Sequence, residues 1–140
     1  MLCRDVMKTD VRCATAQTTV AQAAALMRDE EIGFLPICDE MRNVIGTLTD
    51  RDIAIRVVAE NQSANQSAEL FMSPAVVTCL SDEDLSTAQE LMSEMQVSRI
   101  VCTSEDGQLE GVISLSDIAQ VDGARAAATL RSVTEREARM

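Results

Sequence analysis

The sequence is almost without aromatic residues and has no histidine. It contains two Phe and no Trp or Tyr, so the core has to be built from Val, Ile, Leu, Met and Ala, and aromatic stacking on nucleic-acid bases is not available. Without His, the chain lacks the commonest general base and the Ser/His and Cys/His pairs of nucleophilic enzymes. It also lacks a Gly-rich phosphate loop. We therefore expect a protein without catalytic activity.

Basic residues and long apolar runs are also scarce. Lys and Arg number 12 against 23 Asp and Glu, which gives a net charge of −11 and disfavours nucleic acid as a partner. No stretch reaches the roughly 18–20 apolar residues of a membrane-spanning helix, and residues 1–10 lack an apolar leader. We expect a cytoplasmic protein with neither a nucleic-acid nor a membrane partner.

Metal-binding patterns are missing as well. The five cysteines form no C-x-x-C pair and have no His to join them, so we expect no metal site and reduced thiols. These cysteines are Cys3, Cys13, Cys38, Cys79 and Cys102.

With 140 residues, of which 46% are hydrophobic, the chain can form one compact domain or two half-sized units that share a core.

The chain contains an internal repeat. When residues 7–54 are aligned with residues 72–119, an offset of 65, ten identities appear without a gap, among them Met7/Met72, Gly46/Gly111 and Asp52/Asp117. Similar apolar pairs fall at the same offset, and so many matches exceed what composition alone produces. We divide the chain into a first repeat (5–60), a polar linker (61–69), a second repeat (70–120) and a helical tail (121–140).

Each copy is expected to fold as β-α-β-β-α. The runs 11–15 and 76–80 are rich in β-prone residues and predict the first strand. Thr19 and Asp84 are candidate N-caps of an apolar-faced helix. Two further apolar runs in each copy, 34–38 with 44–48 and 100–102 with 109–113, predict a hairpin, and a last helix is expected to begin near Asp50 or Ser116.

Two segments carry a resemblance to a known family. Gly46-Thr-Leu-Thr49-Asp-Arg-Asp52 and Gly111-Val-Ile-Ser114-Leu-Ser-Asp117 are similar to the G-h-h-[ST]-x-x-D signature of cystathionine-β-synthase-type (CBS) domains. The segment Ile32–Ile37 resembles the part of that family that precedes its second strand. The resemblance implies a stand-alone CBS pair, or Bateman module, of α+β class, with two repeats packed sheet to sheet about a pseudo-twofold axis. It also implies clefts for AMP, ADP, ATP or S-adenosylmethionine.

The resemblance further implies which residues bind such a ligand. The hydroxyl and the aspartate of each signature would contact phosphate and ribose, a nearby Arg would contact phosphate, and backbone groups of the strands would frame the adenine. The residues so placed are Thr49, Arg51, Asp52, Val11, Cys13, Ile32 and Phe34 in one cleft, and Ser114, Asp117, Val76, Thr78, Val97 and Arg99 in the other. Phe34 departs from the small residue that is frequent at its position and could partly fill the first cleft.

The residues themselves allow a second reading of the signature. Thr49-x-x-Asp52 and Ser114-x-x-Asp117 are also capping boxes, which stabilise a helix start whether or not a ligand binds. The glycine is expected to end a strand, where the backbone bends or is closely approached. An aspartate at the start of a helix can accept both ribose hydroxyls, and the hydroxyl and the helix N-terminus offer donors to phosphate. Both roles remain open at this point.

Assembly and regulation complete the expectation. A copy of about sixty residues is too small to be stable alone, so we expect an intramolecular pair, and the resemblance adds a homodimer of whole chains. The tail, with Ala124, Leu130 and Val133 at near-helical spacing, is expected to extend the last helix and to pack on the partner chain. The expected function is ligand-dependent regulation of an unknown protein partner, with no required cofactor. The alternative is an interaction module with degenerate clefts.

Overall fold

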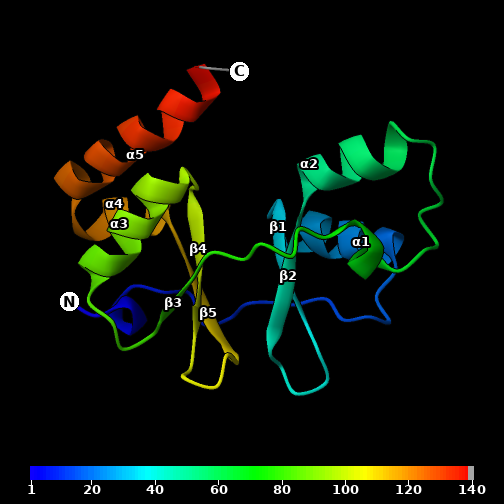
Figure 1. The fold of residues 1–140 in the computed structure, drawn as a ribbon, viewed down its shortest axis with the longest axis horizontal. Helices are drawn as coiled ribbons and strands as arrows, with labels where there is room; N and C mark the ends of the chain where they lie inside the picture. Colours follow the sequence, from blue (N-terminus) through cyan, green and yellow to red (C-terminus); the bar gives the residue numbers. More distant parts are fainter. Residues whose placement is uncertain (139–140) are drawn as a thin grey trace. The chain divides into compact units, whose positions relative to one another are not determined.

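The structure is a computed structural model that describes residues 1–138, and it divides into two compact units (Figure 1). The first-repeat unit comprises Arg12–Val76. The second-repeat unit comprises Met1–Val11 together with the chain from Val77 onward. Each unit combines helices with its own sheet, which confirms the α+β class.

The first-repeat unit contains a two-stranded antiparallel sheet of β1 (Phe34–Cys38) and β2 (Val44–Thr49). Helix α1 (Val20–Glu30) precedes β1. After β2 the chain forms one turn of α-helix, α2 (Asp50–Asp52), and continues as the π-helical segment η2 (Ile53–Val58). The 3₁₀ turn η3 (Ala68–Phe71) begins at the end of the linker.

The second-repeat unit has a three-stranded sheet in the order β3-β4-β5, with β3 parallel to β4 and β4 antiparallel to β5. Its elements are the 3₁₀ turn η1 (Cys3–Asp5), β3 (Thr78–Leu80), α3 (Leu85–Met95), β4 (Arg99–Thr103), β5 (Leu109–Ser114), α4 (Leu115–Val121) and α5 (Gly123–Ala138). The strand-helix-strand-strand-helix order of β3 to α4 is the expected one.

The first helix of each unit starts and stops at local signals in the sequence. The Thr19 hydroxyl accepts the N–H of Gln22 at 3.1 Å, and the Gln22 side chain accepts the N–H of Thr19 at 2.9 Å, which makes a complete capping box. In α3 the Asp84 carboxylate caps the N–H of Ser86. Both helices end at a residue in the left-handed region, Glu31 and Gln96, which lie 65 positions apart.

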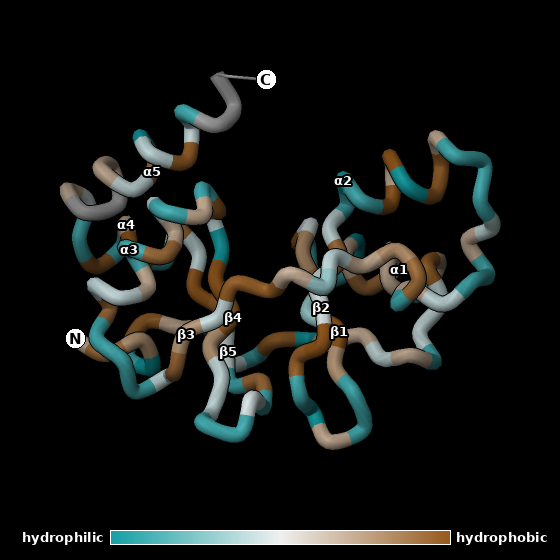
Figure 2. Tube along the Cα trace, in the orientation of Figure 1, coloured by the Kyte–Doolittle hydropathy of each residue, from teal (hydrophilic) through white to brown (hydrophobic). Residues whose placement is uncertain are grey.

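The two hairpins are copies of each other in backbone detail. The register of β1 with β2 shifts between Ile37 and Cys38, and that of β4 with β5 shifts between Cys102 and Thr103, again 65 positions later. Coloured by hydropathy, the hairpin turns and the linker after η2 are mostly hydrophilic, whereas strand segments are mostly hydrophobic (Figure 2). The sequence repeat is therefore a structural repeat.

The first residues of each repeat pair with the hairpin of the other copy. Lys8 and Val112 exchange two backbone hydrogen bonds of 3.0 and 3.1 Å, and Thr47 and Ser73 exchange two of 3.0 and 2.8 Å. Consequently residues 1–11 complete the second-repeat unit and residues up to Val76 complete the first-repeat unit.

Two local expectations about the strands were wrong. The run 11–15 makes only a single parallel bridge, Ala14 with Ile37, because Val11 belongs to the second-repeat unit and a turn, in which Thr18 donates its N–H to the carbonyl of Thr15, begins at the end of the run. The signature glycines lie inside β2 and β5 instead of at strand ends; they are closely approached, since a Cβ on Gly111 would lie 2.7 Å from the Lys8 carbonyl oxygen.

The tail forms the separate helix α5 instead of an extension of α4. Asp122, with extended backbone angles, ends α4, and α5 begins at Gly123. Helix α5 packs against α3 and α4 and buries Thr129 and Val133, whereas Ala124 and Leu130 are exposed. Residues 139–140 of the expected tail lie outside the described residues.

Candidate functional site

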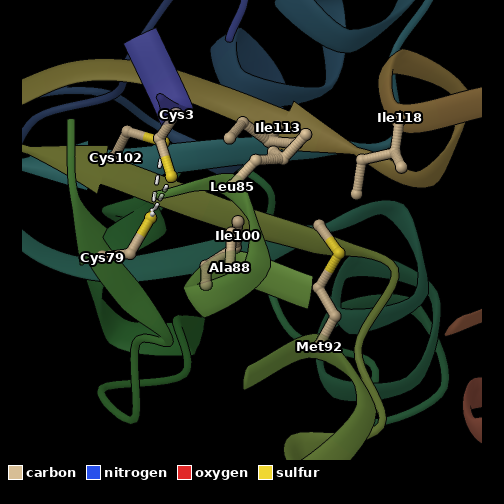
Figure 3. Close-up of a cluster of buried hydrophobic side chains, with 9 residues drawn as sticks. All are labelled: Cys3, Cys79, Leu85, Ala88, Met92, Ile100, Cys102, Ile113 and Ile118. Carbon is tan, nitrogen blue, oxygen red and sulfur yellow. Dashed lines mark hydrogen bonds between the residues drawn. The ribbon is translucent and has the colours of Figure 1, made fainter. Parts of the chain in front are cut away.

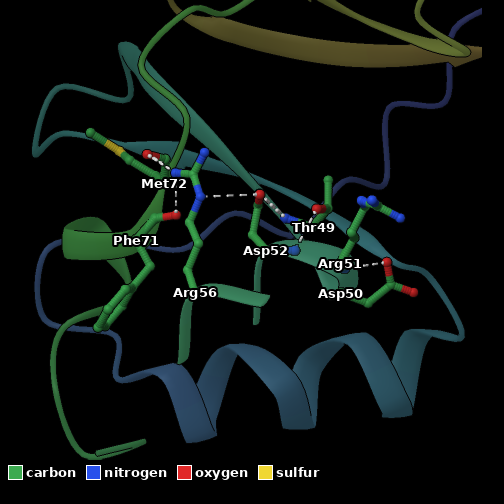
Figure 4. Close-up of polar contacts among 7 residues, drawn as sticks. All are labelled: Thr49, Asp50, Arg51, Asp52, Arg56, Phe71 and Met72. Carbon is green, nitrogen blue, oxygen red and sulfur yellow. Dashed lines mark hydrogen bonds and ion pairs between the residues drawn. The ribbon is translucent and has the colours of Figure 1, made fainter. Parts of the chain in front are cut away.

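Both signature motifs fold as capping boxes at the start of a helix that follows a strand. In the first-repeat unit, the Asp52 N–H donates to the Thr49 hydroxyl at 3.1 Å, and the Thr49 N–H donates to Oδ2 of Asp52 at 2.9 Å (Figure 4). In the second-repeat unit, the corresponding distances between Ser114 and Asp117 are 3.2 and 2.9 Å. The capping interpretation of these residues is confirmed in both copies.

The second oxygen of each aspartate faces a cation. Oδ1 of Asp52 lies 3.8 Å from Nε of Arg56, whose guanidinium also donates to the Phe71 and Met72 carbonyl oxygens (Figure 4). Oδ1 of Asp117 lies 3.5 Å from Nζ of Lys8. Each carboxylate thus uses one oxygen for the helix cap and turns the other towards a basic side chain.

The two carboxylates differ in burial and in their basic neighbours. The side chain of Asp117 is 6% exposed and that of Asp52 is 19% exposed. Arg56 follows Asp52 by four positions on the same helical stretch, whereas Lys8 comes from the N-terminal segment of the chain. The second aspartate is therefore the more enclosed, and its charge is balanced by a residue remote in sequence.

The predicted strand residues lie next to these caps. Phe34 opens β1 opposite Thr49, and Arg99 opens β4 opposite Ser114. Just before them, the half-buried Ile32 and Val97 donate their N–H groups to the carbonyls of Met27 and Met92, at the ends of α1 and α3. Each unit thus brings together a hydroxyl, an aspartate and the first residue of the neighbouring strand.

The remaining predicted residues are placed less closely. Arg51 is exposed beside Asp50, whose carboxylate accepts the Arg51 N–H at 2.8 Å. Val11 belongs to the second-repeat unit and Val76 to the first-repeat unit.

Two further predicted residues, Cys13 and Thr78, lie in the same unit as their signature motif. Cys13 is half-buried in the first-repeat unit, and Thr78 is an exposed residue at the start of β3. Burial and the proximity of Cys13 raise the pKa of the Cys38 thiol to about 12, so Cys38 is protonated at neutral pH.

Sequence reasoning missed the two residues that face the aspartates. Arg56 follows Asp52 by four positions, a spacing that places both on one face of a helical segment, so the i,i+4 pattern would have indicated it. Lys8 gave no such signal, because its counterpart in the second copy is the uncharged Ser73.

Two general properties complete the description of the site. Within the part of the chain that the structure describes, no set of three or more His, Cys, Asp or Glu side chains is arranged to hold a metal ion. None of the helices in residues 1–138 combines the length and apolar character needed to cross a membrane.

The fold and the paired capping motifs define a tandem-repeat protein with one signature in each α+β unit. The CBS domain family matches residues 3–59 and 67–123. The chain belongs to this family as a CBS pair.

Among curated proteins, the chain is 33% identical over 118 residues to Hypoxic response protein 1 of Mycobacterium tuberculosis, covering 84% of this chain and 82% of that protein. It is 31% identical over 116 residues to the CBS domain-containing protein YhcV of Bacillus subtilis, covering 83% and 81%. An uncharacterized protein of Methanopyrus kandleri is 30% identical, and the matched region spans 61% of its length.

Two solved structures resemble this one closely. The crystal structure of Hypoxic response protein 1, with two coordinated zinc ions, superimposes with a TM-score of 0.78 at 32% identity, covering 86% of this chain and 98% of that chain. The CBS domain pair of protein MJ0100, in complex with 5′-methylthioadenosine and S-adenosyl-L-methionine, gives a TM-score of 0.77 at 25% identity, covering 89% and 98%.

Proposed function

We propose that the chain is a regulatory module that binds an adenosine-containing ligand, such as AMP, ADP, ATP or S-adenosylmethionine, and that it performs no catalysis. Two lines of support exist. The chain is a CBS pair, and the CBS pair of MJ0100, to which it is 25% identical, holds two compounds that share an adenosine group. A hydroxyl paired with an aspartate, the two side chains that the resemblance assigns to phosphate and ribose, is present in both repeats.

The observation that carries the proposal is the duplicated carboxylate. A carboxylate can accept about four hydrogen bonds. Asp52 and Asp117 each accept one capping N–H on Oδ2 and pair Oδ1 with a cation, so lone pairs remain for the two hydroxyls of a ribose.

The other residues take the roles that the family resemblance gives them. Thr49 and Ser114 offer a hydroxyl, and Arg51 and Arg99 a positive charge, to phosphate oxygens. Backbone groups frame the adenine in each cleft. These groups belong to Val11, Cys13, Ile32 and Phe34 for one ligand and to Val76, Thr78 and Val97 for the other. No cofactor is required for this function.

The alternative function is an interaction module whose clefts no longer bind ligand, and two observations favour it. Phe34 is a bulky residue beside Thr49, where the second copy has Arg99 beside Ser114. Nζ of Lys8 lies 3.5 Å from Oδ1 of Asp117, the oxygen that a ribose would use. A ligand in the second-repeat unit has to displace Lys8 or share Asp117 with it.

Assembly and localisation are part of the proposal. We expect the chain to form a homodimer in the cytoplasm and to transmit the bound state to a protein partner that remains to be identified. Exposed apolar residues, Ile55 and Val58 on η2 and Val121 at the end of α4, support an interface between chains. A stable dimer would cover such residues.

A thermal-shift screen tests the binding proposal. The purified chain is heated with AMP, ADP, ATP or S-adenosylmethionine, and with GMP as a control that carries the same ribose and phosphate on another base. A ligand at 100 times its Kd adds about 2.7 kcal/mol of stability. At least one adenosine ligand should raise the Tm. If none of the four does so at millimolar concentration, the degenerate-cleft alternative replaces this proposal.

A further inference from the structure

Three cysteine sulfurs meet in the core of the second-repeat unit (Figure 3). Cys3 belongs to η1, Cys79 to β3 and Cys102 to β4. The Cys79 sulfur lies 3.7 Å from the Cys3 sulfur and 3.7 Å from the Cys102 sulfur, and all three residues are buried. The thiol cluster, as we call these three residues, therefore has Cys79 in hydrogen-bonding contact with both of the others.

The internal repeat shows that the fold does not need sulfur at these positions. The residues 65 positions away from Cys3, Cys79 and Cys102 are Ala68, Ala14 and Ile37. All three are fully buried in the core of the first-repeat unit. The same fold is thus packed once with alkyl groups and once with three thiols in contact.

We propose that Cys3 and Cys79 form a reversible disulfide when the protein meets a disulfide oxidant such as glutathione disulfide. Cys79 and Cys102 are also within disulfide range, because they are register partners on β3 and β4. Both, however, are held in the hydrogen-bonded ladder of the sheet. Cys3 lies in a single 3₁₀ turn, in which the N–H groups of Cys3 and Arg4 donate to the carbonyls of Glu83 and Ser81 in the loop after β3. Such a turn opens locally more readily than a central strand, which exposes Cys3 to the oxidant.

The electrostatics of the cluster favour Cys3 as the attacking thiolate. Hydrogen bonds from Cys102 and Cys79 lower the pKa of the Cys3 thiol, against the opposing effect of burial. Hydrogen bonds to Cys3 and Cys79, together with burial, raise the pKa of Cys102. The thiolate is the reactive form of cysteine, so reaction starts at Cys3.

The reaction proceeds in two exchanges. The Cys3 thiolate attacks one sulfur of glutathione disulfide, a bond forms between Cys3 and one glutathione, and the other glutathione leaves as a thiolate that takes up a proton. When η1 closes again, the Cys79 thiol gives up its proton as its sulfur attacks the Cys3 sulfur, and the second glutathione leaves as a thiolate that takes up a proton. Two protein thiols have lost two protons and two electrons, and one glutathione disulfide has become two glutathiones.

The disulfide would enclose an entire unit of the chain. The loop from Cys3 to Cys79 contains the whole first-repeat unit, Arg12–Val76, with both points at which the chain passes between the units. It would also tie the segment that carries Lys8, the residue that faces Asp117, to β3. Oxidation therefore acts on the N-terminal segment of the second-repeat unit, and this proposal does not depend on ligand binding.

Peptide mapping tests the proposal directly. Each of the five cysteines falls in a different tryptic peptide: 1–4, 13–28, 29–42, 57–99 and 100–125. The reduced full-length chain is incubated with glutathione disulfide, free thiols are alkylated in denaturant, and the digest is analysed by mass spectrometry. We expect peptide 1–4 linked to peptide 57–99, and loss of the link after reduction. A link of 57–99 to 100–125 in its place overturns the proposal. So does a Cys3 that stays fully alkylated in the native chain under a treatment that oxidises the denatured chain.

Two variants sharpen the test. Cys3→Ala, which copies Ala68 of the other repeat, should remove the link, whereas Cys102→Ala should retain it. Closing so long a loop should also raise the Tm of the parent chain by about 5 °C or more on oxidation. The Cys3→Ala chain, treated identically, should show no such rise; an equal rise in both chains contradicts the assignment to Cys3.

Discussion

At Asp52 and Asp117, one carboxylate oxygen holds the start of a helix and the other faces a cation. The first contact contributes to folding, and the second leaves an oxygen that a ligand can share. The two contributions are separable, because stability and affinity are measured independently. At the scale of single residues, this pair of contacts is the basis of the proposed function.

Replacing either aspartate by Ala separates the two contributions. Loss of the capping acceptor should lower the free energy of unfolding by about 1 kcal/mol. Loss of a charged acceptor for ribose hydroxyls should weaken adenosine-ligand affinity by about 1.5–3 kcal/mol, or roughly ten- to a hundredfold, with the larger effect at Asp117. Denaturant melts and calorimetry on each variant measure both quantities.

Asp84→Ala provides the matched control, since Asp84 caps α3 away from either signature. It should reduce stability by a similar amount and leave affinity unchanged. Equal ligand affinity in the parent, Asp52→Ala and Asp117→Ala chains would show that the signature aspartates are caps alone.

The signature glycines offer a second test at residue scale. A Cβ at Gly46 would lie 2.9 Å from the Ser73 carbonyl oxygen, and one at Gly111 would lie 2.7 Å from that of Lys8. Gly46→Ala and Gly111→Ala should therefore push away the segment that pairs with the strand and cost about 1–3 kcal/mol of stability.

Gly123→Ala is the comparison for these glycines, because its Cβ would meet no atom within 4 Å and it lies at the start of α5. We expect it to be neutral or slightly stabilising. Chemical denaturation of the three variants is the measurement, and a Gly111→Ala chain as stable as Gly123→Ala would contradict the close approach of Lys8.

At the scale of elements, the parts that the sequence predicted well are those set by local patterns. The Thr19 and Asp84 caps, the two hairpins and the repeat offset all follow from spacing over a few residues or from identities between copies. Helix η2 was expected as an ordinary helix, because an apolar pattern at Ile53 and Val57 does not distinguish the π form from the α form.

Pairings between distant segments were not predictable from such patterns. Periodicity shows that a segment has a buried face and does not show which copy covers it, so the exchange of residues 1–11 and 72–76 between units was missed. Lys8 facing Asp117 depends on that exchange. The first strand of the first repeat pairs only at Ala14, because Val11 belongs to the other unit and the Thr15–Thr18 turn begins at the last residue of the run.

Helix α5 can be tested as an element of the second-repeat unit. Val133 is 5% exposed where α5 packs against its neighbours, whereas Leu130, on the same helix, is 50% exposed. Val133→Ala should lower stability by about 1–2 kcal/mol, and Leu130→Ala by about 0.5 kcal/mol or less. Thermal melts of the two variants compare them, and the reverse order would contradict the packing of α5.

At the scale of the whole molecule, the net charge of −11 acts on any phosphate-bearing ligand. Only local cations, with Arg51 and Arg99 proposed for the role, oppose this repulsion. AMP or ADP should therefore bind at least as tightly as ATP without Mg²⁺, and added salt should weaken binding only modestly. Calorimetry in which ATP binds while millimolar AMP is silent would contradict this order.

The proposed homodimer is also a property of the whole molecule. Light scattering at micromolar concentration should give twice the 15.2 kDa chain mass. If the tail packs on the partner chain, a chain truncated after residue 120 should dissociate. A monomer mass for the parent would refute the dimer, and an intact dimer of the truncated chain would remove the tail from the interface.

The account as a whole depends on ribose recognition by the two signature aspartates. Its most direct test is calorimetric titration of the full chain with AMP and, in parallel, with 2′-deoxy-AMP, which lacks one of the hydroxyls that Asp52 and Asp117 are proposed to accept. We predict that AMP binds and that the deoxy compound binds about tenfold more weakly or worse. Equal affinity for the two nucleotides, or no heat from AMP at millimolar concentration, would contradict the account.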